Sequence, residues 1–202
     1  RPPGRTPQMT SPELSIVIAS VNGLPYVNDC LASIAQHAPD AEVIVADSTD
    51  AQPRSALAER WPGVKLLRFD SPKTVPELRA AGIFSASRSY VAVIEDHCLI
   101  TATWAKSIVD AHRRGNSVVG GPVRNVEPRV RDWAAFLFEY SAHMEPSVSG
   151  VQGHPTGLNA SSAARAIRAA TAPHREWTSD CCGASPRRRP PSHPTTPAGA
   201  RP

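Results

Sequence analysis

The stretch LSIVIAS, residues 14–20, is the clearest structural signal in this chain. It is a short run of β-branched and other apolar residues that ends in a small polar side chain, which is typical of a strand buried on both faces. Residues 1–12, RPPGRTPQMTSP, are rich in proline and show no apolar period. We therefore expect a disordered lead-in at 1–12 and a folded domain that begins at residue 13.

Further apolar runs follow this strand, and segments with helical spacing separate them. The sequence predicts strands at 43–45, 64–69, 89–97 and 117–123, and helices at 25–37, 55–60, 75–87 and 103–115. This alternation indicates an α/β fold with a mostly parallel, doubly wound sheet flanked by helices. The pattern ends near residue 168, so we expect one domain at 13–168 and a disordered tail at 169–202, which is rich in proline and arginine.

The net charge of +4 does not describe a basic folded surface. Residues 9–170 contain 15 Lys and Arg against 16 Asp and Glu, and the positive excess lies in the two terminal segments. A nucleic-acid partner is therefore not expected. No apolar run is long enough to cross a bilayer and no secretory leader is present, so we expect a soluble, cytoplasmic protein.

The cysteines show no C-x-x-C pair, which argues against a disulfide framework or a zinc site. We expect reduced thiols at all four positions, Cys30, Cys98, Cys181 and Cys182.

Polar clusters follow three of the predicted strands. They are Ser20 with Asn22, Asp47 with Asp50, and the run Glu95, Asp96 and His97. The carboxyl ends of parallel strands meet at one edge of a sheet, where ligands bind in open α/β folds. A shared site is therefore more economical than three unrelated polar junctions.

The run from Glu95 to His97 has the chemistry of an ion site. Side chains at i and i+2 of an extended segment point the same way, so Glu95 and His97 can converge while Asp96 faces elsewhere, unless the turn rotates it inward. Carboxylate oxygen with imidazole suits Mn²⁺ or Mg²⁺, held partly by the protein and partly by substrate phosphates. The alternative is an ordinary polar junction between a strand and a loop.

Two other charged residues have open interpretations. Asp47 could accept hydrogen bonds from a ribose or a base, or could stabilise its own turn. Arg79, in the helix before the ion motif, could neutralise a phosphate or be an exposed, solvated side chain.

Five segments in this order resemble the family 2 glycosyltransferases of the GT-A fold. They are LSIVIASVNGLPYVNDCLASI, EVIVADSTD, LRAAGIFSASRSYVAVIEDH, TWAKSIVDAH and VVGGPVRN, and the resemblance covers residues 14–165. It implies a Rossmann-like sheet and a divalent ion. It also implies inverting transfer of a sugar from a nucleotide-diphosphate donor to a hydroxyl acceptor, which could be a glycan, a lipid or a small molecule.

The resemblance also assigns roles to residues of this chain. It implies that the nucleotide is bound by Ala19, Ser20, Asn22, Asp47, Arg79 and Asp96. It implies that the ion is bound at Glu95, Asp96 and His97, which occupy the place of the family's Asp-x-Asp motif. The segment GHPTGLNASSAARAI, with Asn159 and Ser161, is similar to the family's acceptor-side segment, so the acceptor side would comprise Gly120, Gly121 and Asn159.

The chain departs from the family at three points. The usual DDGSTD loop is shortened to DSTD, which leaves open which Asp meets the nucleotide. The acidic pair that supplies the catalytic base is missing, and only Glu176 and Asp180 in REWTSD stand near its place. The switch to arginine, proline and serine resembles a truncated or frame-shifted C-terminus.

Two other functions fit parts of the sequence. The chain could be a remnant that binds nucleotide-sugars without turnover, or a receiver domain phosphorylated on Asp47. The segment RDWAAFLFEYSAHM, residues 131–144, could close the acceptor side, pack a partner or touch a membrane peripherally. Core packing is the interpretation that its composition favours most.

Overall fold

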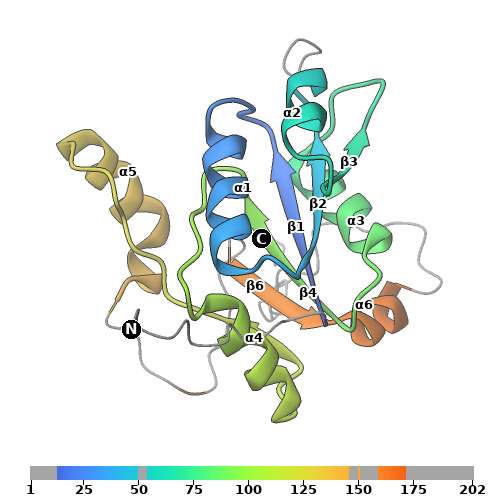
Figure 1. Ribbon diagram of the computed structural model, residues 1–202. Helices are drawn as coiled ribbons and strands as arrows, with labels where there is room; N and C mark the ends of the chain where they lie inside the picture. The colour runs from blue at the N-terminus through green and yellow to red at the C-terminus, as the bar shows by residue number, and fades with distance from the viewer. Residues whose placement is uncertain (1–12, 50–53, 146–149, 151–158, 172–202) are drawn as a thin grey trace, which may run out of the picture.

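The computed structural model describes residues 13–49, 54–145, 150 and 159–171. Its strands are β1 (Leu14–Ser20), β2 (Glu42–Asp47), β3 (Lys65–Arg68), β4 (Tyr90–Glu95), β5 (Val118–Gly120) and β6 (Asn159–Ala163). Its helices are α1 (Tyr26–His37), α2 (Arg54–Arg60), α3 (Val75–Ser85), α4 (Trp104–Arg113), α5 (Val130–Tyr140) and α6 (Ala164–Thr171), with the short 3-10 helix η1 (Ser141–His143). Figure 1 shows the sheet between two layers of helices.

The strands form one sheet in the order β3-β2-β1-β4-β6-β5. Strands β3, β2, β1 and β4 pair in parallel, whereas β6 lies antiparallel between β4 and β5. The predicted mostly parallel α/β sheet is therefore confirmed, and β6 is an addition that the sequence did not predict. Receiver domains have the strand order 2-1-3-4-5, so the receiver interpretation is wrong.

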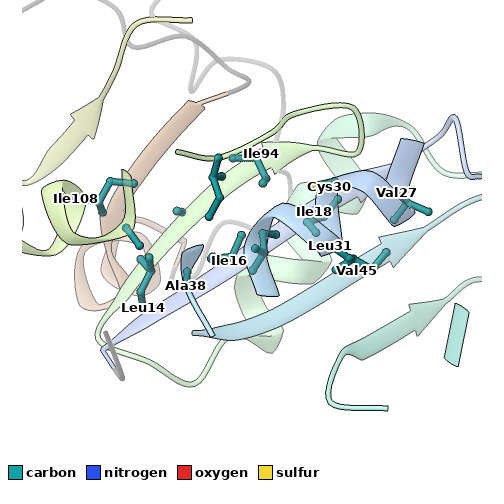
Figure 2. Close-up of a cluster of buried hydrophobic side chains, with 14 of the residues drawn as sticks. Leu14, Ile16, Ile18, Val27, Cys30, Leu31, Ala38, Val45, Ile94 and Ile108 are labelled. Atoms are coloured by element: carbon teal, nitrogen blue, oxygen red, sulfur yellow. The ribbon is translucent and has the colours of Figure 1, made fainter. Parts of the chain in front are cut away.

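One face of the sheet carries the larger core, drawn in Figure 2. Ile16 and Ile18 of β1 have no exposed surface, and they pack with Leu31 of α1 and Ile108 of α4. Leu57 of α2 belongs to the same cluster. Helices α1, α2 and α4 therefore cover this face, and β1 is buried along its whole length as the apolar run predicts.

The opposite face is covered by α3 and α6. Val17 of β1 packs with Ile83 of α3 and Ala164 of α6. Helix α3 approaches β1 closely at Gly82, where an added Cβ would lie 2.2 Å from Val17 Cγ1. Leu78 and Gly82 of this helix are buried, whereas Ala81 is only partly buried.

Helix α5 contradicts the expected core packing of residues 131–144. None of its residues is buried, and Val130 and Phe138 are 86% and 90% exposed. Figure 1 shows this helix standing apart from the sheet. No helix in the part of the chain that the structure describes is long and apolar enough to cross a membrane.

The expected disordered lead-in, residues 1–12, lies outside the described residues. Helix α6 continues to Thr171, three residues past the domain end expected from the sequence. The rest of the expected tail, residues 172–202, lies outside the described residues.

Candidate functional site

The polar ends of β1, β2 and β4 meet at one edge of the sheet. Ser20 is in register with Asp47 on the neighbouring strand β2, and Ala19 is in register with Glu95 on β4. The strand order changes direction here, because β2 and β3 continue to one side of β1 and β4 lies on the other. This is the topological switch point at which open α/β sheets bind ligands. Asp50, the partner expected for Asp47, lies outside the described residues.

Asp47 is buried and holds its own loop. Its Oδ1 accepts hydrogen bonds from the backbone N–H of Thr49 at 3.0 Å and from the Thr49 hydroxyl at 2.7 Å. A hollow beside it is lined by Ser20, Gly23, Leu24, Val27, Asp47, Thr49 and Leu57. Both interpretations of Asp47 therefore have support, because the carboxylate stabilises its turn and also borders a hollow at the ligand edge.

The side chains of Ala19 and Ser20 are both buried. Ala19 packs with Ala46 and Leu78 in a small cluster under the edge. The carbonyl oxygen of Ser20 accepts a hydrogen bond from the backbone N–H of Ser48 at 3.1 Å, which joins the ends of β1 and β2. Ala19 as a whole is only 1% exposed, between its strand partners Ala46 and Glu95.

Arg79 reaches the ion motif from α3. Its Nη2 donates to Glu95 Oε1 at 2.5 Å, and both side chains are about a quarter exposed, at 23% and 24%. Its buried Nε has no hydrogen-bond partner among the described residues. Arg79 is therefore neither a solvated surface side chain nor, in this structure, a free phosphate ligand: it neutralises Glu95.

Asp96 is turned inward, away from the surface of the edge. Its side chain is fully buried and receives hydrogen bonds from the loop that follows β1, residues 21–23. Burial by itself raises the pKa of Asp96, but contacts with His97, Asn22 and Ser20 outweigh it and lower the pKa to about 2. Asp96 is thus a buried carboxylate in its charged form at neutral pH.

His97 is the exposed member of the motif, with 40% of its side chain accessible. Its Nε2 lies 3.8 Å from Glu95 Oε2, and its Nδ1 lies 3.6 Å from Asp96 Oδ1. The Asp96 carboxylate raises the pKa of His97 against the effect of burial, and the charge of Glu95 adds to the rise. Glu95 and His97 therefore lie together, as the i and i+2 spacing predicts.

The donor set fits a partly protein-held ion. In residues 13–49, 54–145, 150 and 159–171 no group of three His, Cys, Asp or Glu side chains is arranged to hold a metal ion. Glu95 and His97 nevertheless present one carboxylate and one imidazole to the same space, a pair that Mn²⁺ accepts. An ion here would need further ligands, such as the oxygens of a diphosphate.

The expected acceptor-side residues also reach this edge. Asn159 on β6 is in register with Ile94 on β4, and its Oδ1 accepts a hydrogen bond from Trp104 Nε1 at 3.0 Å. Gly121 lies against Asn159, because an added Cβ would be 3.1 Å from Asn159 Nδ2. Gly120 pairs with Ala160 next to them.

The candidates for the catalytic base are not among the residues that the structure describes. Glu176 and Asp180 are both outside the described residues.

Ser161, the other residue of the acceptor-side resemblance, is buried and serves the sheet. Its hydroxyl donates to the carbonyl of Val119 at 3.2 Å and lies 3.0 Å from Nε2 of His112. Ser161 is therefore held between β5 and α4, not presented at the ligand edge.

Sequence reasoning missed the last turn of α5. Burial raises the pKa of Tyr140, a hydrogen bond with Glu139 raises it further, and the charge of Glu95 adds to the rise. The charge of Glu139 likewise raises the pKa of His97. Glu139 and Tyr140 are therefore coupled electrostatically to residues of the ion motif, and their only signal in the sequence was an apolar, aromatic segment.

The described cysteines are free thiols, as expected. Cys30 is buried and Cys98 is partly buried. Burial is the main cause that raises the pKa of the Cys98 thiol to about 11 and raises that of Cys30 as well. Neither is a reactive thiolate at neutral pH. Cys181 and Cys182 lie outside the described residues.

The fold is an open, mostly parallel α/β sheet, a class in which ligands bind beyond the carboxyl ends of the parallel strands. The chain belongs to the family described as Glycosyl transferase family 2, which it matches over residues 15–168. Comparison with curated proteins gives no significant match.

Solved structures share the fold. A mannosyltransferase, PcManGT from Pyrobaculum calidifontis in complex with GDP-Man and Mn²⁺, is 14% identical with a TM-score of 0.58, over 81% of this chain and 49% of that one. TarS from S. aureus is 12% identical with a TM-score of 0.63, over 78% of this chain and 49% of that one. A TarS structure with UDP-GlcNAc is 17% identical with a TM-score of 0.52, over 58% of this chain and 36% of that one. The chain thus spans about half the length or less of these structures.

Proposed function

We propose that this domain binds a nucleotide-diphosphate sugar at the carboxyl edge of β1, β2 and β4, and that it takes part in inverting transfer of the sugar to a hydroxyl acceptor. The observation that carries the proposal is the meeting of Asp47, Glu95 and His97 at one edge in a member of glycosyl transferase family 2. Solved relatives with GDP-Man and Mn²⁺ or with UDP-GlcNAc support a donor of this class.

The nucleoside is assigned to the hollow between the ends of β1 and β2. Leu24, Val27 and Leu57 supply apolar wall, and Asp47 supplies a carboxylate that can accept from a ribose hydroxyl or a base N–H. Ser20 also lines this hollow, and the family resemblance adds Ala19 and Asn22 to this side of the site. The lining of this hollow combines apolar side chains with a few polar groups, as the lining of ligand sites does.

The diphosphate is assigned to the space in front of Glu95 and His97. These two side chains would hold Mn²⁺ or Mg²⁺, and the ion would stabilise the charge that develops on the leaving diphosphate. Arg79 sets the charge balance, because its guanidinium pairs with Glu95 and leaves the pair close to neutral before the ligand arrives. An anionic ligand therefore meets little net repulsion.

The acceptor is assigned to the side formed by Gly120, Gly121 and Asn159. Glycine leaves the backbone open to a bulky ligand, and Trp104 fixes the Asn159 amide by its hydrogen bond. Inverting transfer needs a base within hydrogen-bond reach of the acceptor hydroxyl. Glu176 and Asp180 are the candidates by position in the sequence.

Thermal unfolding with nucleotide and ion tests the donor site. UDP and GDP are each added with and without Mn²⁺, since the structure favours neither base. At about 100 times Kd a ligand raises the free energy of unfolding by ~2.7 kcal/mol, which is several degrees in Tm. We expect a rise with one nucleotide that grows with Mn²⁺, and no ion-dependent growth in the double variant Glu95→Ala with His97→Ala.

The matched control is Asp110→Asn, which changes an exposed carboxylate paired with Lys106 on α4, away from the edge. Asp110→Asn should show the same rise in Tm with nucleotide and Mn²⁺ as the wild type. An unchanged melting curve of the wild-type chain with both nucleotides would refute the donor site. A rise without sugar transfer or donor hydrolysis would instead favour the binding module that does not turn over.

A further inference from the structure

Asp96 differs from both of its neighbours in the ion motif. Glu95 and His97 keep 24% and 40% of their side chains exposed, whereas Asp96 keeps none. A fully buried carboxylate is costly unless hydrogen bonds satisfy its oxygens. The groups that satisfy Asp96 therefore show what it does.

Those groups come from the loop after β1, more than 70 residues earlier in the chain. Asp96 Oδ2 accepts backbone N–H bonds from Val21 at 3.0 Å, Asn22 at 2.8 Å and Gly23 at 3.3 Å. Asp96 Oδ1 accepts a bond from the Asn22 side-chain amide at 2.7 Å. Three successive backbone donors thus point at one oxygen, and a fourth donor holds the other.

This loop has a conformation that needs support. Gly23 lies at φ +67°, which favours glycine, and an added Cβ would be 3.2 Å from Thr49 Cγ2. Consecutive N–H groups that converge would repel one another without an anion between them. The Asp96 carboxylate is that anion, and it leaves the loop beside the hollow assigned to the nucleoside.

The same carboxylate faces the ion motif. His97 Nδ1 lies 3.6 Å from Asp96 Oδ1, while His97 Nε2 lies on the side of Glu95. A carboxylate beside one ring nitrogen directs the other nitrogen toward the ligand space. Asp96 is thus in contact with the nucleotide loop and close to the imidazole at once.

We propose that Asp96 is a positioning residue that holds the loop of Val21, Asn22 and Gly23 and orients His97, and that it is not an ion ligand. The inference rests on the proposed function for the meaning of the two parts it joins. To coordinate an ion, Asp96 would have to release donors that already hold both of its oxygens, through one buried and three partly buried hydrogen bonds. Asp96 therefore joins the loop of Val21, Asn22 and Gly23 to the ion motif before any ligand binds.

Amide hydrogen exchange measured by NMR tests the loop directly, without ligand. In Asp96→Ala the amides of Val21, Asn22 and Gly23 should exchange at least about tenfold faster than in the wild type, because each loses a charged acceptor. Asp96→Asn keeps one carbonyl oxygen, so the exchange rates of these amides should lie between those of the wild type and those of Asp96→Ala. The control Asp110→Asn should leave these three amides unchanged.

Nucleotide binding in EDTA separates a positioning role from ion ligation. UDP and GDP are titrated calorimetrically with no divalent ion present. Asp96→Asn should weaken the affinity of the ion-free complex by about tenfold, the order expected when charged hydrogen bonds to the loop are lost. An ion ligand would lose affinity only when Mn²⁺ is added, so unchanged ion-free affinity together with unchanged exchange would overturn the proposal.

Asn22→Ala tests the same role if the Asp96 variants do not fold. This change removes the bond from the Asn22 amide to Asp96 Oδ1 and leaves the buried carboxylate in place. Faster exchange at Val21 and Gly23 in Asn22→Ala would support the positioning role, and unchanged exchange there would overturn it if Asp96→Asn cannot be purified folded.

The two failures are distinguishable. If the wild type binds neither nucleotide, the proposed function fails while the exchange measurement still decides the role of Asp96 in the loop. If nucleotide binds and exchange at the loop does not respond to Asp96, the positioning role alone fails.

Discussion

The two halves of this domain are built differently. The donor half, residues 13–115, contains nearly all of the buried side chains, including the whole of β1. In the acceptor half, residues 116–171, only Ser161 and Ala164 are buried among the side chains that the structure describes. The donor half therefore carries the core, and the acceptor half is attached to it through β6.

The same difference between the halves affects how rigidly the side chains of the site are held. Asp47 and Asp96 are fixed by hydrogen bonds beneath the ligand edge, so the donor side is ordered by the fold itself. Glu139 affects the pKa of His97 from a helix with no buried residue. The acceptor side is thus the half whose geometry depends least on the core.

The largest expected contrast in stability is between two apolar-to-alanine substitutions, one in each half. Ile18→Ala in β1 should lower the free energy of unfolding by about 2–5 kcal/mol, because Ile18 has no exposed surface. Phe138→Ala in α5 should change it by less than about 0.5 kcal/mol, because Phe138 is 90% exposed. Urea denaturation measures both, and equal losses would erase the distinction between the halves.

A second prediction concerns the contact between α3 and β1. Gly82→Ala should cost about 1–3 kcal/mol of stability, because the new methyl group would meet Val17 in a packed core. Gly63→Ala is the matched control, since an added Cβ there meets nothing within 4 Å. Thermal unfolding should separate the two, and a neutral Gly82→Ala would mean that α3 can move away from β1.

A third prediction concerns the link between the halves. His112 is buried in α4, with Nε2 3.0 Å from Ser161 Oγ and Nδ1 2.7 Å from the carbonyl of Asn116, and its ring stacks on Tyr90. His112→Ala should cost about 2 kcal/mol, since both bonds and the ring contact are lost.

Hydrogen exchange shows where that loss falls. Protection should decrease at Ser161 in β6 more than at Ile18 in β1. An equal decrease in both strands would contradict the view that β6 is the weaker attachment.

The smallest expected effect lies at the end of the donor half opposite the site. Burial raises the pKa of Glu42, but hydrogen bonds from Ser15 and Ser87 outweigh it and lower the pKa below its usual value. A lowered folded-state pKa stabilises the fold above the unfolded-state value and loses this effect as the pH falls through the folded-state value.

Glu42→Gln should therefore cost about 1 kcal/mol at pH 7 and less near pH 3. Denaturation of both chains at the two pH values measures this. A loss of unfolding free energy in Glu42→Gln that grows as the pH falls would contradict a lowered pKa of Glu42 in the folded state.

The sequence predicted the donor half well because its signals are local. Apolar runs such as residues 14–20 and helical spacing in 103–115 each report burial within one element. Strand β6 was missed because NASSA contains only small side chains with no apolar alternation. The exposure of α5 was missed because periodicity shows an amphipathic helix but not what covers it.

The site was predicted in the same uneven way. The convergence of Glu95 and His97 was predicted from their spacing, although β4 ends at Glu95 and His97 lies in the turn that follows it. The inward turn of Asp96 could not, because its partners Val21, Asn22 and Gly23 are 73–75 residues away. The capture of Glu95 by Arg79 likewise depends on how α3 packs against the sheet.

Paramagnetic broadening by Mn²⁺ tests the central claim most directly. With UDP or GDP present, added Mn²⁺ should broaden the amide signals of Asn22 and His97 most strongly. The effect should weaken along β1 and β4 toward Leu14 and Tyr90, roughly 20 Å away at the other end of these strands. Broadening that is centred at Leu14 and Tyr90, or that does not depend on nucleotide, would contradict a nucleotide and ion site at this edge.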